Sequence, residues 1–186
     1  DFNGQKDGID PFTAQGGYDL MVAVKPDNPG VVFVGGTNLY RSTSGFTTNN
    51  ATAWIAGYKY WGASATSFPV ETYANTHPDI HNLVFDPTNA NRAICASDGG
   101  LHITDNIMAG TVSATAPVTW TMVSNYQSSQ YYHVHTEQRQ TGSQANNFIG
   151  GMQDNSTYLR VDGDNSHVRA GSGDGGAAAI AKFIDF

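Results

Sequence analysis

The sequence of 186 residues is poor in basic side chains and contains a single cysteine. Lys and Arg number 9 against 16 Asp and Glu, which gives a net charge of −7. Nucleic-acid binding depends on clustered basic side chains, so the composition argues against a nucleic-acid partner. Cys95 has no second cysteine with which to form an internal disulfide, and its place in a predicted strand favours a small buried hydrophobic residue over a nucleophile. No apolar run reaches the roughly 18 residues that a membrane-spanning helix needs, so the sequence predicts no membrane span.

Long helical periodicity is also missing, and glycine is abundant instead, with 21 residues. Short apolar stretches separated by turns rich in Gly, Asn and Pro predict an all-β protein. The chain begins Asp1-Phe2-Asn3 without a methionine, which indicates a processed or partial product.

One hairpin pattern occurs three times. In Arg92–Thr104, a short apolar run leads into Asp98-Gly99-Gly100, and then Leu101 and Ile103 alternate with polar residues. Glycine and aspartate favour tight turns, and alternation with period 2 is typical of a half-buried strand. The same unit is predicted at Val31–Ser42 and at Asn147–Val161. Three copies in one chain indicate a repeat architecture.

Each hairpin lies within a longer round of four predicted strands. The rounds cover residues 18–57, 80–123 and 130–170, and a further round begins in 177–186 with a strand at Ala177–Phe183. Consecutive antiparallel four-stranded meanders without helical crossovers predict a β-propeller, of which about three blades are present; a β-sandwich is the alternative. Propellers close with about four to eight blades, so we expect further polypeptide to complete the ring.

Several motifs together resemble one known family. They are residues 17–36 (from Gly17-Tyr18-Asp19 to Gly35-Gly36), His77–His81, Ser97–His102, Gly150–Asn155 and Gly173–Gly176. This ordered set resembles sialidase-like β-propellers with BNR (Asp-box) repeats, as found in large secreted bacterial proteins described as glycosyl hydrolases. The resemblance covers roughly residues 17–183 and implies a propeller fold and a secreted or bacterial cell-surface location.

The sequence departs from that family in ways that bear on activity. An Asp-box reads Ser-x-Asp-x-Gly-x-x-x-x-Trp, but Arg41–Gly45 lacks the Asp, and Ile103–Asn106 lacks the nearby Gly. The resemblance implies that these are structural turns. The Phe-Arg-Ile-Pro motif of sialidases is absent from the sequence, and no arginine triad can be assigned. Sialidase activity is therefore not inferred from the resemblance.

A meander blade places alternate loops on the same face. This rule predicts one loop face that carries His77, Asp79, Asp98, Asp154 and Asp174. Gln153 adjoins Asp154, and an aromatic insertion between Gly57 and Pro78 reaches the same face. That insertion contains, among other aromatic residues, Tyr60 and Trp61.

Each of these features has two interpretations. His77, Asp79 and His81 alternate along the chain and suit a divalent metal, or they form a His–Asp hydrogen bond that fixes a loop. The carboxylates of Asp98, Asp154 and Asp174 suit Ca²⁺ or an acid/base pair, or they cap their own turns. The aromatic residues suit stacking on sugar rings, or they cover the edge of a blade.

Three functions follow from these features. The first is a secreted or cell-surface propeller module that binds glycan or protein on the loop face. The second is a glycoside hydrolase that uses rim carboxylates, and the third is a structural fragment completed by other polypeptide. The acidic balance predicts a negative rim, which favours a divalent cation or a neutral glycan over anionic sialic acid.

Overall fold

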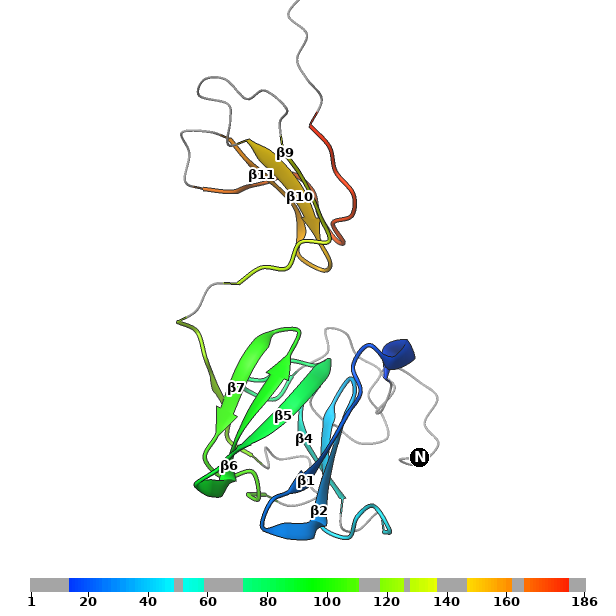
Figure 1. Ribbon diagram of the computed structural model, residues 1–186, viewed down its shortest axis with the longest axis vertical. Helices are drawn as coiled ribbons and strands as arrows, with labels where there is room; N and C mark the ends of the chain where they lie inside the picture. Colours follow the sequence, from blue (N-terminus) through cyan, green and yellow to red (C-terminus); the bar gives the residue numbers. More distant parts are fainter. Residues whose placement is uncertain are drawn as a thin grey trace, which may run out of the picture. The chain divides into compact units, whose positions relative to one another are not determined.

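The computed structural model describes residues 14–48, 52–58, 72–110, 118–125, 128–136, 147–161 and 166–180. These residues form β-strands and one short 3-10 helix, η1 (Gln15–Gly17), which confirms the all-β prediction for the described part of the chain (Figure 1). In that part, no helix has the length and apolar character needed to span a bilayer. The chain divides into two compact units, Asp1–Asn125 and Tyr126–Phe186.

The first unit contains two four-stranded antiparallel sheets. The first sheet has the order β1 (Met21–Lys25), β2 (Asn28–Gly35), β3 (Leu39–Ser42) and β4 (Thr52–Ala56). The second sheet has the order β5 (Ile80–Asp86), β6 (Asn89–Ser97), β7 (Gly100–Thr104) and β8 (Thr121–Met122). Each strand pairs with its neighbour in sequence, so both sheets are meanders, as predicted.

The same turn chemistry opens both sheets. Asn28 accepts the backbone N–H of Gly30 on its side-chain oxygen at 3.0 Å, and Asp86 accepts the backbone N–H of Thr88 at 2.8 Å. Side-chain capping of this kind replaces a strand ladder with a tight turn. The segments that contain Pro26 and Pro87 therefore connect the first two strands of each sheet.

The core of the first unit lies between its two sheets. Phe33 of β2 is fully buried, and its ring centroid lies 5.5 Å from that of Phe85 on β5. The indole N–H of Trp120, just before β8, donates to the carbonyl of Ile55 on β4 at 2.9 Å. Large buried side chains and their hydrogen bonds thus join the two sheets into one unit.

Arg41 on β3 joins the sheets at a second place. Its guanidinium donates to the carbonyls of Ile107 at 2.6 Å, Ala109 at 2.8 Å and Gly110 at 3.1 Å. The side chain is only 4% exposed, and burial lowers the pKa of the guanidinium. Arg41 therefore holds the loop after β7, the region that resembles a degenerate Asp-box.

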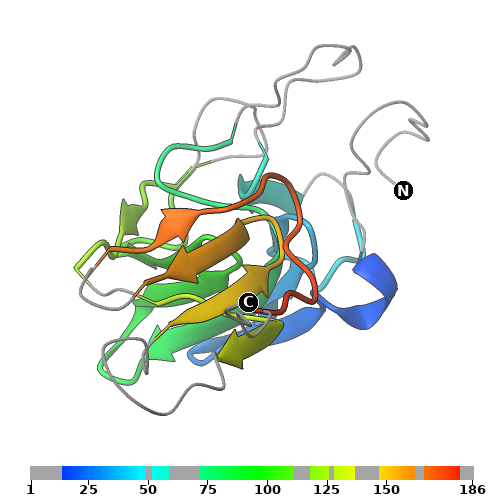
Figure 2. The same ribbon diagram turned by 90° about the horizontal axis from the view of Figure 1, so that it is seen from above.

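The second unit contains the third predicted hairpin in a sheet of its own. The order is β12 (Val168–Arg169), β11 (Ser156–Arg160), β10 (Phe148–Met152) and β9 (His133–Thr136), all antiparallel (Figure 2). Gly151 and Gly175 allow the segment after β12 to approach β10 and β11 closely, because a Cβ at either position would overlap backbone atoms of Gly176 or Ser156. The N–H of Gly175 donates to the carbonyl of Met152 at 2.7 Å.

The three predicted hairpins therefore belong to three separate sheets, as the repeat pattern predicted. Two details differ from the sequence analysis. The first strand begins at Met21 instead of Tyr18, because η1 and a turn occupy the residues before it. No strand starts at Ala177 within the described residues, which end at 180. Three consecutive alanines have weak strand propensity, and the N–H of Ile180 donates to the side chain of His135 on β9 at 3.0 Å, and not to a backbone carbonyl as in a strand pair.

Candidate functional site

Three loops of the first unit meet at one end of its two sheets. The N–H of Asp79 donates to the carbonyl of Thr37 in the β2–β3 turn at 2.9 Å. The N–H of Asp98, in the β6–β7 turn, donates to the carbonyl of Asp79 at 3.1 Å. Backbone hydrogen bonds thus bring the segment before β5 together with both turns. The predicted placement of Asp79 and Asp98 on a shared loop face is confirmed within this unit.

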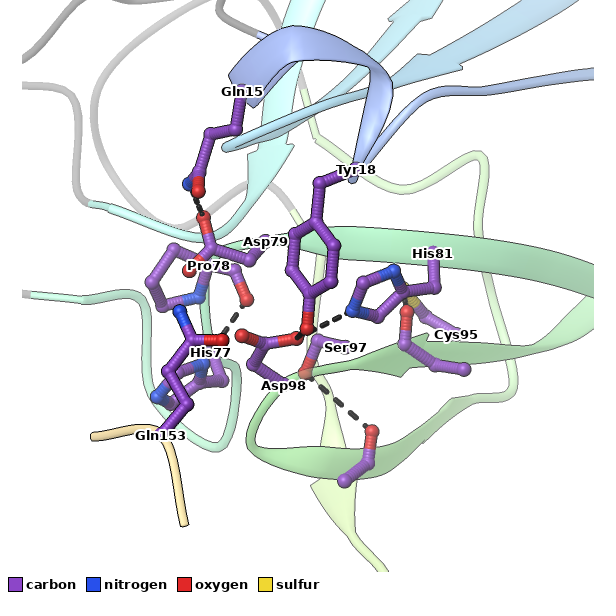
Figure 3. A network of polar contacts seen from close by, with 12 residues as sticks. Gln15, Tyr18, His77, Pro78, Asp79, His81, Cys95, Ser97, Asp98 and Gln153 are labelled. Carbon is purple, nitrogen blue, oxygen red and sulfur yellow. Dashed lines mark hydrogen bonds and ion pairs between the residues drawn. The ribbon is translucent and has the colours of Figure 1, made fainter. Parts of the chain in front are cut away.

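Asp98 carries the densest set of contacts at this end. Its carboxylate Oδ1 is hydrogen-bonded to His81 Nε2 and accepts a hydrogen bond from the Tyr18 hydroxyl at 3.2 Å (Figure 3). The Tyr18 and His81 rings meet edge to face, with centroids 5.0 Å apart. The His81 and Asp98 side chains are 32% and 21% exposed, so the pair lies at the surface with part of it open to solvent. Asp98 therefore does more than cap its own turn.

Asp79 and His77 have other partners. The Gln15 amide donates to Asp79 Oδ1 at 2.6 Å, and His77 Nδ1 lies 3.0 Å from the carbonyl of Pro78 (Figure 3). Asp79 has a left-handed backbone with φ of 61°, which directs the chain from the loop into β5. Gly99 lies against His77, and a Cβ at position 99 would overlap the imidazole. The β6–β7 turn can therefore approach His77 only with glycine at this position.

In the described contacts, the His–Asp interaction lies between His81 and Asp98, and not among the three residues of the histidine motif. His77, Asp79 and His81 each bond to a different group, and His81 pairs with Asp98. Among the described residues, no group of three or more His, Cys, Asp or Glu side chains is arranged to hold a metal ion. The structure thus shows a His–Asp interaction that joins β5 to the β6–β7 turn.

A buried hydrogen bond lies next to the β6–β7 turn that carries Asp98. The Ser97 hydroxyl and His102 Nε2 are 2.8 Å apart, and His102 is 1% exposed. Burial lowers the pKa of His102, and the nearby His77 adds to this effect, whereas the backbone of Asn75 opposes it. The bond links the last residue of β6 to β7 directly behind the Asp98 turn.

The sequence analysis named Asp19 only as part of the motif at residues 17–36 and gave it no functional role. It is fully buried, and neither of its carboxylate oxygens has a hydrogen-bond partner of ordinary geometry within the described chain. Burial raises the pKa of Asp19; its own backbone N–H and His81 oppose this rise, and Asp98 adds to it. The sequence signal that could have pointed to Asp19 is its place as an acidic residue at the start of an otherwise apolar run.

The remaining predicted carboxylates lie in the second unit. The carboxylate Oδ1 of Asp174 accepts the backbone N–H of Asp154 at 2.9 Å, so these two turns meet. The Gln153 amide oxygen accepts a hydrogen bond from the Tyr132 hydroxyl. Asp174 therefore caps the β10–β11 turn, whereas the structural alternative considered above was that it caps its own turn.

The aromatic candidates Tyr60 and Trp61 lie outside the described residues, but both ends of their insertion are described. Asn38 in the β2–β3 turn accepts the N–H of Tyr58 on its side-chain oxygen at 2.7 Å. Tyr73 donates its N–H to the carbonyl of Gly57 at 3.0 Å, and its side chain is buried. The insertion therefore leaves and rejoins the fold beside the β2–β3 turn, on the loop face that carries Asp79.

Comparisons with protein-family models, with curated protein sequences and with solved structures found no match to this chain.

Proposed function

We propose that this chain is part of a sialidase-like β-propeller, secreted or displayed at a bacterial cell surface, and that its loop face binds a neutral glycan. The observation that carries the proposal is the convergence of Asp79, His81 and Asp98 at one end of the first unit, where backbone hydrogen bonds fix the loops that bear them. The motifs that resemble BNR-repeat propellers support the same reading.

The propeller is supported by the apolar residues on the outer faces of the sheets. Val22 and Val24 on β1 are 67% and 50% exposed, and Val84 and Ile94, paired on β5 and β6, are 55% and 42% exposed. These side chains point away from the shared core of the first unit. Antiparallel sheets that are apolar on both faces pack against further sheets on both sides, and radial stacking of four-stranded meanders is the propeller arrangement. We therefore expect each outer face to be covered by another blade.

The chemistry of the loop face favours sugar hydroxyl groups as ligands. Carboxylates are strong acceptors for O–H donors, and charge-assisted hydrogen bonds are roughly twice as strong as neutral ones. Asp79 and Asp98 already accept neutral amide and hydroxyl donors, which are the donor types that a glycan presents. The net charge of −7 disfavours anionic glycans. Tyr60 and Trp61 lie outside the described residues; the described ends of their insertion are anchored beside the β2–β3 turn, and aromatic residues are of the type on which sugar rings stack.

A glycan panel tests the proposal. Wild-type protein is screened against immobilised neutral polysaccharides and against sialylated glycans, and reducing-end release is measured in the same samples. We expect binding to at least one neutral glycan, and a loss of about tenfold or more in affinity for Asp98→Asn and for Trp61→Ala. Asp105→Asn is the matched control, because Asp105 is 87% exposed and pairs with Arg92 away from the site.

Three outcomes would decide against this proposal. Binding to sialylated glycans alone would contradict the charge argument. Equal glycan affinities of the Asp98→Asn and Asp105→Asn variants would show that Asp98 does not take part in glycan binding. Release of reducing ends that is lost in Asp98→Asn would replace glycan binding with glycoside hydrolysis, the other function considered from the sequence.

A further inference from the structure

One short segment donates a hydrogen bond to each of the two carboxylates of the candidate site, Asp79 and Asp98. This segment is Ala14–Leu20, and it precedes β1. The Gln15 amide donates to Asp79 at 2.6 Å, and the Tyr18 hydroxyl donates to Asp98 at 3.2 Å (Figure 3). The Tyr18 ring also covers the edge of His81. Ala14–Leu20, hereafter the strap, therefore occupies acceptors that a bound glycan requires.

The backbone of the strap is a tight turn in an uncommon conformation. Gln15, Gly16 and Gly17 have φ values of 43°, 73° and 98°, so three consecutive residues lie in the left-handed region. A Cβ at Gly16 or Gly17 would meet no atom within 4 Å, so backbone geometry, and not crowding, calls for glycine at both positions. Gln15 carries a side chain in this region, which is costly for a residue other than glycine. The turn is thus a strained hinge whose geometry its side-chain contacts help to hold.

In the position that the structure shows, hereafter the closed state, the strap buries Asp19 at a cost in free energy. Its carboxyl group is fully buried without a hydrogen-bond partner in the described chain, and a buried polar group that lacks a partner raises the free energy of the state that buries it. The titratable groups that interact with it are His81 on β5 and Asp98 in the β6–β7 turn. Moving the strap away from the site would return the Asp19 carboxyl to water.

We propose that the strap is an autoinhibitory contact, in which Gln15 and Tyr18 occupy Asp79 and Asp98 in place of the hydroxyl groups of a glycan. This inference rests on the proposed glycan-binding function. The amide and the hydroxyl are neutral donors, as sugar hydroxyl groups are, so strap and ligand compete for the same lone pairs. Tyr18 is 49% exposed and Leu20 57% exposed, so little apolar burial opposes opening.

The stability of the closed strap also depends on pH, and the buried carboxyl group of Asp19 determines the direction of that dependence. Burial favours the uncharged acid, so the strap is most stable at low pH, where Asp19 is protonated. As pH rises, Asp19 ionises beside the carboxylate of Asp98 and away from water, and the closed state loses stability relative to the open one. We therefore expect tighter glycan binding at higher pH, and Asp19→Asn, which cannot ionise, to remove that dependence.

The test combines backbone amide hydrogen exchange of residues 14–20 with glycan affinity, both on the full chain. The variants are Gln15→Ala with Tyr18→Phe, which removes both strap donors, and Asp19→Asn, which keeps the shape without the charge. Tyr132→Phe is the control, because that hydroxyl bonds Gln153 in the second unit. Tryptophan fluorescence of Trp54 and Trp120 checks that the first unit stays folded. At pH 7 we expect exchange in the strap to rise at least threefold in the double variant and to fall in Asp19→Asn, with glycan affinity changing in the same directions.

The outcomes separate this inference from the proposed function. Unchanged amide exchange of the strap in the double variant, or a lower glycan affinity of that variant, would overturn the autoinhibitory role of the strap. Either result would leave the proposed glycan binding intact. Exchange that responds as expected while neither wild type nor variant binds any glycan would overturn the proposed function.

Discussion

Replacing Arg41 with alanine should destabilise the first unit strongly. The guanidinium donates to the carbonyls of Ile107, Ala109 and Gly110 and is 4% exposed. Hydrogen bonds to charged groups contribute about 1.5–3 kcal/mol each, and removing the donor leaves at least one buried carbonyl unpaired. Part of this loss is offset because the variant no longer buries a charge. We expect a net loss of about 3 kcal/mol, in the range of other broken buried charge networks.

Urea unfolding followed by tryptophan fluorescence measures this loss in the right part of the molecule. All three tryptophans, Trp54, Trp61 and Trp120, lie within the first unit. With an m-value of about 2 kcal/mol/M, the expected loss lowers the midpoint by about 1.5 M. Arg41→Lys should be intermediate, because an ammonium keeps the charge but cannot reach all three carbonyls in the guanidinium's fork geometry.

Arg92→Ala is the matched control for this experiment. Its guanidinium is 47% exposed and pairs with Asp86 and Asp105 at 3.8 Å and 3.2 Å. Exposed ion pairs contribute little to stability, so its midpoint should move only slightly. Equal shifts for Arg41→Ala and Arg92→Ala would refute the reasoning that Arg41 holds the loop after β7 through buried bonds.

Three further predictions follow from buried groups. Because burial lowers the pKa of His102 in the folded protein, the unfolded chain binds a proton at His102 more readily. The contribution of His102 to the stability of the first unit should therefore be complete above about pH 6.5 and decrease as the pH falls below that value. In urea titrations at pH 8 and 5.5, His102→Gln should reduce this decrease. Burial raises the pKa of the Cys95 thiol to about 12, so a thiol reagent at pH 8 should label the native protein far more slowly than the protein in urea; equal rates would contradict a buried Cys95. Gly175→Ala should speed amide exchange in β10 and β11, whereas Gly171→Ala, where a Cβ would make only ordinary contacts of 3.6 Å or more, should leave that exchange unchanged.

The strands could be predicted from sequence because their signals are local. In Arg92–Thr104, Leu101 and Ile103 alternate with His102 and Thr104, and Asp98-Gly99-Gly100 marks the turn. The pattern predicted the strand correctly, but the structure buries His102 and Thr104 and leaves Leu101 36% exposed, because the polar face of β7 is the one that packs inside. Such patterns depend on neighbouring residues alone, so the hairpins and their meander order were predicted correctly. No strand is seen over the described residues 177–180 of the strand predicted at Ala177–Phe183, and the partner of Ile180 there, the imidazole of His135, is distant in sequence.

The candidate site was only partly predictable for the same reason. Strand alternation and loop order placed Asp79 and Asp98 on one face, which the backbone bonds between their turns confirm. The hydrogen bonds of His81 with Asp98, of Gln15 with Asp79 and of Tyr18 with Asp98 join residues that are 17, 64 and 80 positions apart. No local pattern encodes such pairs, because they depend on how the segment before β1 lies over the ends of two sheets.

The sequence by itself determined the all-β class, the three hairpins in three sheets, and the net negative charge of the chain. These properties depend on residue periodicity, turn chemistry and summed charge, all of which can be read along the chain. Only the tertiary structure decided that the Asp19 carboxylate is buried without a hydrogen-bond partner among the described residues, that Arg41 holds a loop of the neighbouring sheet, and that Asp174 caps the Asp154 turn. Burial and hydrogen-bond partners depend on which surfaces meet when sheets pack, and residues far apart in sequence determine those contacts jointly.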